Sequence, residues 1–164
     1  MYACPCGNFL NFSKGKQCTC TESERNKYLN KLSKAIVDRM DIFTNVSYID
    51  FSEMRGKALE ESSDKIKERV EKVREIQKIR YKNERVSCNS QLNHNQIIKY
   101  INLDSKAEEI LKLYWKKWSL SNRAIDKILK LSQTISDMEE SEKIFTKHIY
   151  EAFNYRKYVN GEIM

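Results

Sequence analysis

The stretch SKAEEILKLYWKKW at residues 105–118, followed after two residues by SNRAIDKILKLSQTISDM at 121–138, decides the fold. In both segments apolar residues recur every three or four positions, which is the spacing of one face of an α-helix. Ser105 and Glu108 form a capping box for the first segment, and Ser121 is a good N-cap for the second. The pattern therefore predicts two consecutive helices. The residues expected to be buried are Ala107, Ile110, Leu111, Tyr114, Trp115 and Trp118 in the first helix, and Ile125, Ile128, Leu129, Ser132, Ile135 and Met138 in the second.

Helical patterns cover most of the remaining chain. A capping box at residues 21–24 opens a helix that continues or restarts further on. Residues 62–64, with serine caps and an acid in the first turn, open a long helix, and a last helix is expected over 141–158. One short strand is expected over residues 42–49, and 51–61 is interpreted as a linker. The predicted apolar faces are Tyr28, Leu29, Leu32 and Ile36; Ile66, Val70, Val73, Ile76 and Ile79; and Ile144, Phe145, His148, Ile149, Ala152 and Phe153.

The composition agrees with this reading. Only four glycines and one proline occur in 164 residues, too few for the many turns of an all-β protein. A chain of this length suits one domain, or one domain plus part of another. We therefore expect a mainly α protein.

Four of the five cysteines lie in the first twenty residues, as Cys4-Pro5-Cys6-Gly7 and Cys18-Thr19-Cys20. Four thiolates can complete the tetrahedral shell of a structural zinc ion. The alternatives are unremarkable thiols or a disulfide pair in an exported protein. The first residues lack the charged and apolar segments of a signal peptide. This indicates a cytoplasmic protein, in which cysteines are reduced or metal-bound rather than disulfide-bonded.

The net charge of +7 indicates either a polyanionic partner, such as nucleic acid or a nucleotide, or an ordinary solvated surface. The same two readings apply to the nine Lys and Arg residues between Lys65 and Arg85. No apolar run reaches the ~18–20 residues that span a bilayer, so no membrane association is expected. A Gly-rich phosphate loop, an acid dyad and a His-x-x-x-His motif are all missing from the sequence. We therefore expect no catalysis by this chain alone.

Arg123 occupies an unusual place. With Ser121 as N-cap, it falls in the first turn of its helix, where the partial positive charge of the helix end disfavours a cation. An anion in front of that turn would instead receive both helix amides and a guanidinium. The alternative is an exposed arginine tolerated at a few tenths of a kcal/mol.

Taken together, these stretches resemble the C-terminal part of the magnesium-chelatase-like AAA+ ATPases of the ComM (YifB) type, a family linked to natural transformation and DNA branch migration. The resemblance covers nearly the whole chain. Its motifs are Cys4-Pro5-Cys6-Gly7, Cys18-x-Cys20-Thr21, Val37-Asp38-Arg39-Met40-Asp41, Ser62-Ser63 leading into Arg69-Val70, Gln77-x-x-Arg80-Tyr81, Cys88-Asn89, Leu120-Ser121-x-Arg123-Ala124, Thr134-Ile135-Ser136-Asp137 and Glu151-Ala152-Phe153-x-Tyr155-Arg156.

The resemblance implies a domain plan and a set of roles. Residues 1–50 would be the end of the AAA+ core, with Cys4, Cys6, Cys18 and Cys20 in an inserted zinc loop and a single core strand. Residues 62–160 would be the four-helix lid. Arg39 matches the arginine-finger position, which reaches the γ-phosphate of a neighbouring subunit. Arg123, with Ser121 before it, matches the sensor-2 position and would contact ATP.

The implied cofactors are ATP with Mg²⁺ in the intact ATPase, and zinc. The implied partners are the remaining AAA+ core, whose Walker A and B segments would lie upstream, the neighbouring subunits of a hexamer, and DNA. The sequence departs from the family in two places: Tyr2-Ala3 replaces Asn-Pro, which removes the sensor-1 asparagine, and Gln133 replaces an arginine. The rival readings are a magnesium-chelatase ATPase subunit, against which the four cysteines argue, and a stand-alone zinc-containing nucleic-acid-binding helical module.

Overall fold

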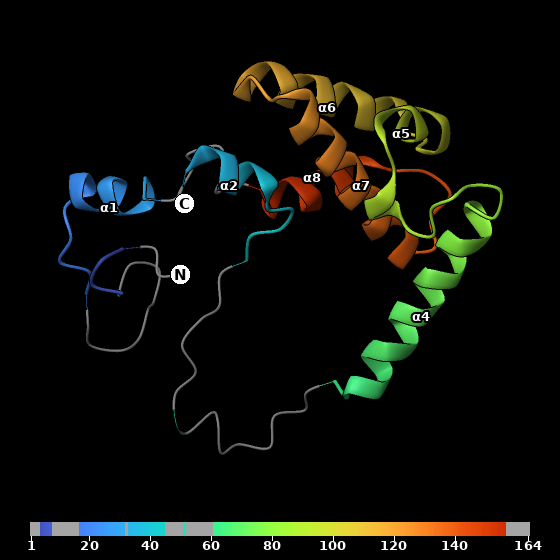
Figure 1. Ribbon diagram of the computed structural model, residues 1–164, viewed down its shortest axis with the longest axis horizontal. Helices are drawn as coiled ribbons and strands as arrows, with labels where there is room; N and C mark the ends of the chain where they lie inside the picture. The colour runs from blue at the N-terminus through green and yellow to red at the C-terminus, as the bar shows by residue number, and fades with distance from the viewer. Residues whose placement is uncertain (1–3, 8–16, 32, 45–50, 52–60, 157–164) are drawn as a thin grey trace. The chain divides into compact units, whose positions relative to one another are not determined.

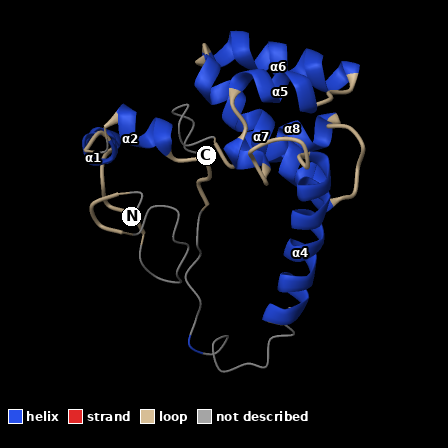
Figure 2. Ribbon diagram, turned by 45° about the vertical axis from the view of Figure 1, so that its right-hand side comes forward, coloured by secondary structure: helices blue, strands red, loops and turns tan. Residues whose placement is uncertain are grey.

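The computed structural model describes residues 4–7, 17–31, 33–44, 51 and 61–156. The protein is mainly helical, as the sequence predicts, and no named strand occurs in these ranges (Figure 2). The chain divides into two compact units. One comprises Met1–Met40 with Thr44–Glu60, and the other Asp41–Phe43 with Glu61–Met164. No helix within the described ranges is long and apolar enough to cross a membrane.

Within the described residues, the first unit has two short helices with defined bounds. α1 (Glu22–Leu29) begins with the predicted capping box, in which Thr21 Oγ1 accepts from the Glu24 amide and Glu24 accepts from the Thr21 amide. The helix then stops, and α2 (Lys34–Arg39) starts anew. α1 buries no residue, and Ile36 is exposed. The predicted apolar face along 28–36 is therefore not a core in this unit; Leu32 lies outside the described residues.

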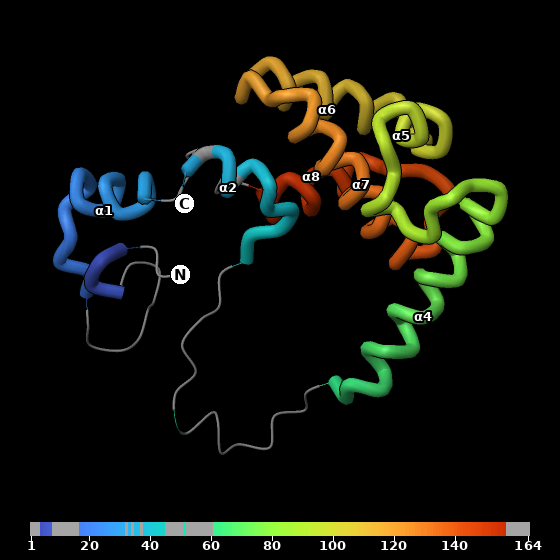
Figure 3. Tube along the Cα trace, in the orientation of Figure 1, coloured from blue at the N-terminus to red at the C-terminus, as the bar shows by residue number. Residues whose placement is uncertain are grey.

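The second unit is a helical bundle that can be followed in Figures 1 and 3. Its elements are α4 (Ser63–Arg80), the 3-10 turn η1 (Asn89–Gln91), α5 (His94–Tyr100), α6 (Ser105–Trp118), α7 (Asn122–Met138) and α8 (Thr146–Asn154). α7 is central: it packs against α8, α4, η1 and α5, while α6 packs against α8. The core contains Tyr81, Leu92, Ile97, Ile101, Ala107, Leu111, Leu120, Ala124, Ile128, Leu129, Ile135, Ile144, Ile149, Ala152 and Phe153.

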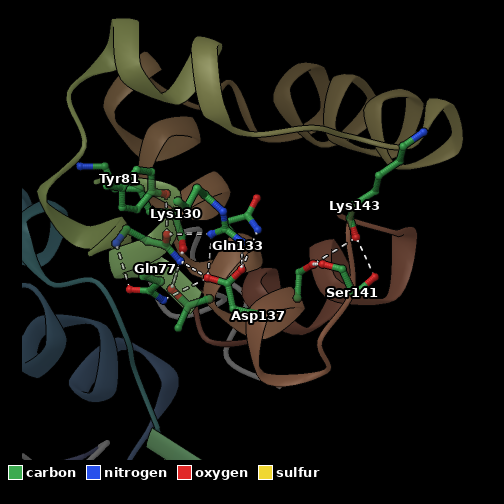
Figure 4. A network of polar contacts seen from close by, with 11 residues as sticks. Gln77, Tyr81, Lys130, Gln133, Asp137, Ser141 and Lys143 are labelled. Carbon is green, nitrogen blue, oxygen red and sulfur yellow. Dashed lines mark hydrogen bonds and ion pairs between the residues drawn. The ribbon is translucent and has the colours of Figure 1, made fainter. Parts of the chain in front are cut away.

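Several helix starts were predicted correctly and two were not. Ser62 caps α4 and Ser121 caps α7, as expected. The cap of α6 is Asp104 rather than Ser105, because the Asp104 carboxylate accepts from the Lys106 amide. α8 begins at Thr146 rather than near residue 141, because Ser136 and Ser141 hydroxyls bind loop carbonyls at 141–143 and hold that stretch out of the helix (Figure 4).

α5 is a helix that the sequence analysis missed. The polar residues of 83–95 favour a loop, yet Asn93 and Gln96 form a capping box that opens a helix at His94. The signal was present in the sequence, since a capping box followed by Ile97, Ile98 and Ile101 is a helix start. It was hidden by the polar composition of the residues before it.

Four predicted apolar faces are only partly buried. In the α4 stripe, Val73 and Ile76 are half-buried, whereas Ile66, Val70 and Ile79 are exposed, and Gln77 is the buried residue of this helix. Figures 1 and 2 show the reason: the N-terminal half of α4 extends away from the other helices of the unit, whereas its C-terminal half, from Lys72 paired with Glu140 onward, lies against them. Trp115, 50% exposed, and Met138 also face solvent. Phe145 is exposed because it precedes α8 instead of lying within it.

The predicted strand and linker fall mostly outside the described ranges. Ile42 to Thr44 are loop, and residues 45–49 lie outside the description. The only extended pairing recorded in the second unit's described part is one parallel bridge between Leu103 and the buried Ile144. In the expected linker, only Phe51 and Glu61 are described. The strand and the linker therefore stay predictions.

Candidate functional site

The four cysteines of the first twenty residues converge on one point. Their Sγ atoms all lie within 4.8 Å of one another, with Cys4–Cys6 at 3.2 Å, Cys6–Cys18 at 3.6 Å and Cys4–Cys18 at 3.7 Å. Four sulfurs at the usual Zn–S distance of ~2.3 Å form a tetrahedron with edges of about 3.8 Å. None of the five cysteines, all of which the structure describes, forms a disulfide bond. The spacing thus fits a four-thiolate metal shell and is too long for a disulfide.

Local structure on both sides supports this cluster. Gly7 closes a turn by donating to the Cys4 carbonyl at 3.2 Å, with a φ of 78° that favours glycine. After Cys20, the chain passes directly into the capping box of α1, and Arg25 Nη1 donates to the Cys20 carbonyl at 2.7 Å. Cys4 is buried while Cys6 is exposed. The two C-x-C pairs are therefore held by a turn on one side and by a helix start on the other.

The thiol of Cys20 reflects this crowding. A hydrogen bond from the Cys6 backbone lowers its pKa, but desolvation and the thiols of Cys6 and Cys18 outweigh it and raise the pKa to about 12. Adjacent sulfurs disfavour a thiolate as long as nothing positive balances them. A divalent cation reverses that preference, since thiolates are its ligands. The residues present fit zinc, which would supply structural cross-linking and no reaction.

Arg123 and Ser121 lie together at the start of α7. Ser121 Oγ accepts from the Ala124 amide at 3.1 Å, so its hydroxyl serves as the helix cap. Arg123 lies in the first turn and is exposed. α6 ends at Trp118, and its C-cap Ser119, left-handed with a φ of 45°, turns the chain into the cap of α7. An exposed guanidinium and the positive end of a 17-residue helix thus share one surface.

Arg39 is the last residue of α2 and is exposed. It belongs to the first unit, whereas Arg123 belongs to the second. A cation at a helix C-terminus is favoured by the helix dipole. Its helix position therefore needs no special explanation, in contrast to that of Arg123.

A buried polar cluster around Asp137 was not foreseen (Figure 4). The Asp137 carboxylate is 1% exposed and accepts from Gln77 at 3.0 Å, Arg80 Nη1 at 3.0 Å, Asn89 at 2.8 Å and Gln133 at 2.9 Å. Burial lowers the pKa of Arg80, but the hydrogen bonds and charge of Asp137 outweigh this and raise it. A buried charge is tolerated when it is paired and hydrogen-bonded. The cluster ties α4, η1 and α7 together.

The remaining members complete this cluster. Tyr81 donates to the Asn89 side-chain oxygen at 2.7 Å, and the Asn89 amide donates to Gln77 at 3.2 Å. Asn89 also donates to the Thr134 hydroxyl at 3.0 Å. The sequence analysis had quoted these residues only as motif positions, because residues from three elements must meet before a network exists.

The basic face of α4 carries acidic partners. Lys67 pairs with Glu71 at 3.7 Å, Lys78 with Glu75 at 3.7 Å, and Arg69 with Glu61 at 2.7 Å. All six side chains are largely exposed. Such pairs are typical of a solvated helix face.

His148, expected to lie within the core, is buried, with Nδ1 accepting from the Phe145 amide and Nε2 next to Glu139, each at 3.0 Å.

Comparison with known families agrees with the two halves of the chain. The family "Magnesium chelatase, subunit ChlI" matches residues 1–54, and "Magnesium chelatase, subunit ChlI C-terminal" matches residues 60–156. The helical unit and the cysteine-bearing segment thus define a magnesium-chelatase-like protein. The chain belongs to this family and is of its ComM/YifB type.

Individual relatives point the same way. The chain is 35% identical over 134 residues to the competence protein ComM of Haemophilus influenzae, covering 81% of this chain and 26% of the relative. It is 32% identical over 146 residues to YifB of Salmonella typhimurium, covering 87% and 28%. For YifB of Escherichia coli the identity is 30% over 148 residues, covering 87% and 28%. The chain therefore spans about a quarter of the length of the curated relatives it matches.

Proposed function

We propose that this chain provides the C-terminal part of a ComM-type AAA+ ATPase, a ring-forming, ATP-driven motor that acts on DNA. In this proposal residues 1–50 belong to the ATPase core and residues 62–160 form its helical lid, joined by a linker at 51–61. The ATP and Mg²⁺ bind at sites completed by core segments that carry the phosphate-binding motifs. The support is the family membership together with the similarity to ComM over 81% of the chain.

The observation that carries the nucleotide-site proposal is the start of α7. Ser121 caps the helix, and Arg123 follows as an exposed residue of its first turn. A triphosphate placed there would accept from the guanidinium while lying at the positive end of the helix. We assign Arg123 the sensor-2 role with Ser121 positioning its turn, and Arg39 the arginine-finger role toward the γ-phosphate of a neighbouring subunit. Both arginines would stabilise negative charge in the transition state.

The test is a chimera in which this chain replaces the matching C-terminal region of Haemophilus influenzae ComM. Arg39→Ala should lower the ATP turnover number by ~10³-fold or more, the scale of an arginine finger. Arg123→Ala should weaken ATP binding as well as turnover. Lys116→Ala, an exposed cation on α6, is the matched control and should change neither. Turnover in both arginine variants within twofold of the control would reject these roles.

The chain alone should hydrolyse no ATP, because its sequence carries no Gly-rich phosphate loop. ATP hydrolysis by the purified chain that survives removal of contaminants would contradict this. A magnesium-chelatase ATPase subunit remains the alternative within the family. A zinc-containing nucleic-acid-binding module is the alternative outside ATPase function, favoured by the converging cysteines and the net charge of +7. Tight binding of bare DNA by this chain, with steep salt dependence, would support that module.

A further inference from the structure

Three residues that precede the helical bundle in sequence form part of it in space. Asp41–Phe43 belongs to the second unit, although the rest of that unit begins only at Glu61. The contacts are specific. Lys127 Nζ lies 2.8 Å from Asp41 Oδ1, Arg156 Nη1 donates to the Asp41 carbonyl at 3.3 Å, and the Phe43 amide donates to the Tyr155 carbonyl at 2.8 Å.

The receiving surface is part of the folded bundle. Lys127 extends from the middle of α7 with its side chain 12% exposed, and Arg156, just after α8, is 2% exposed. Asp41, by contrast, is 72% exposed. Two cations enclosed by the bundle therefore meet one acidic residue that arrives from outside it. Enclosing Lys and Arg is costly unless acceptors are in reach, and here the acceptors include a carboxylate and a carbonyl of the same residue, Asp41.

The bundle contacts backbone groups of the segment 41–43 as well as the Asp41 side chain. Two of the three bonds involve backbone groups of the segment, the Asp41 carbonyl and the Phe43 amide. These two hydrogen bonds orient the segment, because the Asp41 carbonyl must face Arg156 while the Phe43 amide faces the Tyr155 carbonyl. The Asp41 carboxylate adds charge selectivity by facing Lys127. The arrangement resembles the binding of an extended peptide by a preformed surface.

We propose that Lys127, Tyr155 and Arg156 form a docking site for Asp41–Phe43, which fastens the chain just after Arg39 to α7, the helix that carries Arg123 in its first turn. Only Met40 separates Arg39 from Asp41 in sequence. Lys127 lies four residues after Arg123, one helical turn along the same face of α7. Lys127 and Asp41 are positioning residues. Their effect on the two arginines rests on the proposed function; the docking site itself does not.

The consequence is a coupling between two elements. If α7 shifts when an anion binds at its first turn, the docking site carries the segment 41–43 with it. Arg39, two residues before Asp41 in the sequence, is thereby tied through the chain to the segment that α7 holds.

The test is amide hydrogen exchange, followed by NMR on the complete 164-residue chain without nucleotide. The Phe43 amide should be protected by its bond to Tyr155. Asp41→Asn and Lys127→Gln should each speed its exchange by about three- to tenfold, the scale of a hydrogen-bonded ion pair with one exposed partner. The charge-swapped double variant Asp41→Lys with Lys127→Asp should restore protection toward the original value. Lys116→Gln, the same charge change on an exposed site, should have no effect.

The amides of Ile128 and Ile149 report on the bundle itself, since both residues are buried. Their exchange should not change in any of these variants. The proposal is overturned if Phe43 exchanges equally fast in Lys127→Gln and Lys116→Gln. It is also overturned if the core amides speed up together with Phe43, or if the charge swap rescues nothing. Because no nucleotide is present, failure here would leave the ATP-site proposal intact, and failure of the chimera test would leave the docking site intact.

Discussion

Removal of the Asp137 carboxylate should greatly lower the free energy of unfolding of the helical bundle. In Asp137→Ala, the donors of Gln77, Arg80, Asn89 and Gln133 lose their common acceptor. Breaking a buried ion pair by removing one partner costs about 3–5 kcal/mol. Arg80 is 23% exposed and recovers some hydration, so we expect the lower part of that range, about 3–4 kcal/mol.

The assay is urea unfolding of the complete chain, followed by far-UV circular dichroism, with a thermal melt in parallel. For a helical unit of roughly 100 residues, each kcal/mol corresponds to about 4–8 °C, so the Tm should fall by roughly 12–30 °C. Glu109→Ala removes an acid from the exposed face of α6 and is the control, with an expected change within about 0.5 kcal/mol. Asp137→Asn keeps the shape and an acceptor oxygen and should cost less than Asp137→Ala.

A loss of less than about 1 kcal/mol in Asp137→Ala would refute this reasoning. It would mean that water or relaxed side chains replace the carboxylate, and that the cluster contributes orientation rather than stability. A loss equal to that of Glu109→Ala would lead to the same conclusion.

Three further outcomes are expected. Under reducing conditions the chain should bind zinc. Cys18→Ser should weaken binding by more than the ~10–100-fold that outer ligand partners contribute, whereas Cys88→Ser should not. Native mass spectrometry that finds no zinc on the unaltered chain or on Cys88→Ser would contradict the metal site. Hydrogen bonds from Lys99, Tyr100 and Gln96 lower the pKa of Glu84 to about 2. Its stabilisation should therefore be complete above pH ~4.5 and disappear toward pH 2, so that the stabilities of wild type and Glu84→Gln converge in acid; parallel curves would exclude this. Ser121→Ala should cost about 1 kcal/mol through loss of the α7 cap, measured by urea unfolding against Ser119→Ala.

Local sequence was sufficient for features that depend on a few neighbouring residues. The caps at Thr21, Ser62 and Ser121 were predicted because a hydroxyl three residues before an amide satisfies it within the same turn. The mainly α class followed from apolar periodicity in the same way. Ser105 failed as a cap because Asp104, one residue earlier, competes for the same helix end with a stronger acceptor.

Periodicity did not reveal which faces are covered. The stripe of α4 is regular, but burial requires a neighbour along its full length, and among the described residues the neighbours lie along the C-terminal half of this helix. Gln77 is buried there instead, because the partner it meets is the Asp137 carboxylate. That a polar residue such as Gln77 will be buried cannot be inferred from its local sequence when its acceptor lies sixty residues away.

For the candidate sites the same division holds. The sequence by itself singled out Cys4, Cys6, Cys18 and Cys20, because two close pairs of thiols have few chemical uses, and it singled out Arg123 because a cation at a helix start is out of place. Only the tertiary structure brought the four sulfurs within 4.8 Å and placed Asp41 against Lys127. The sequence spacing determines which side chains are close when they lie within about one helical turn of each other. Contacts between distant residues depend instead on how the helices pack, which no local pattern encodes.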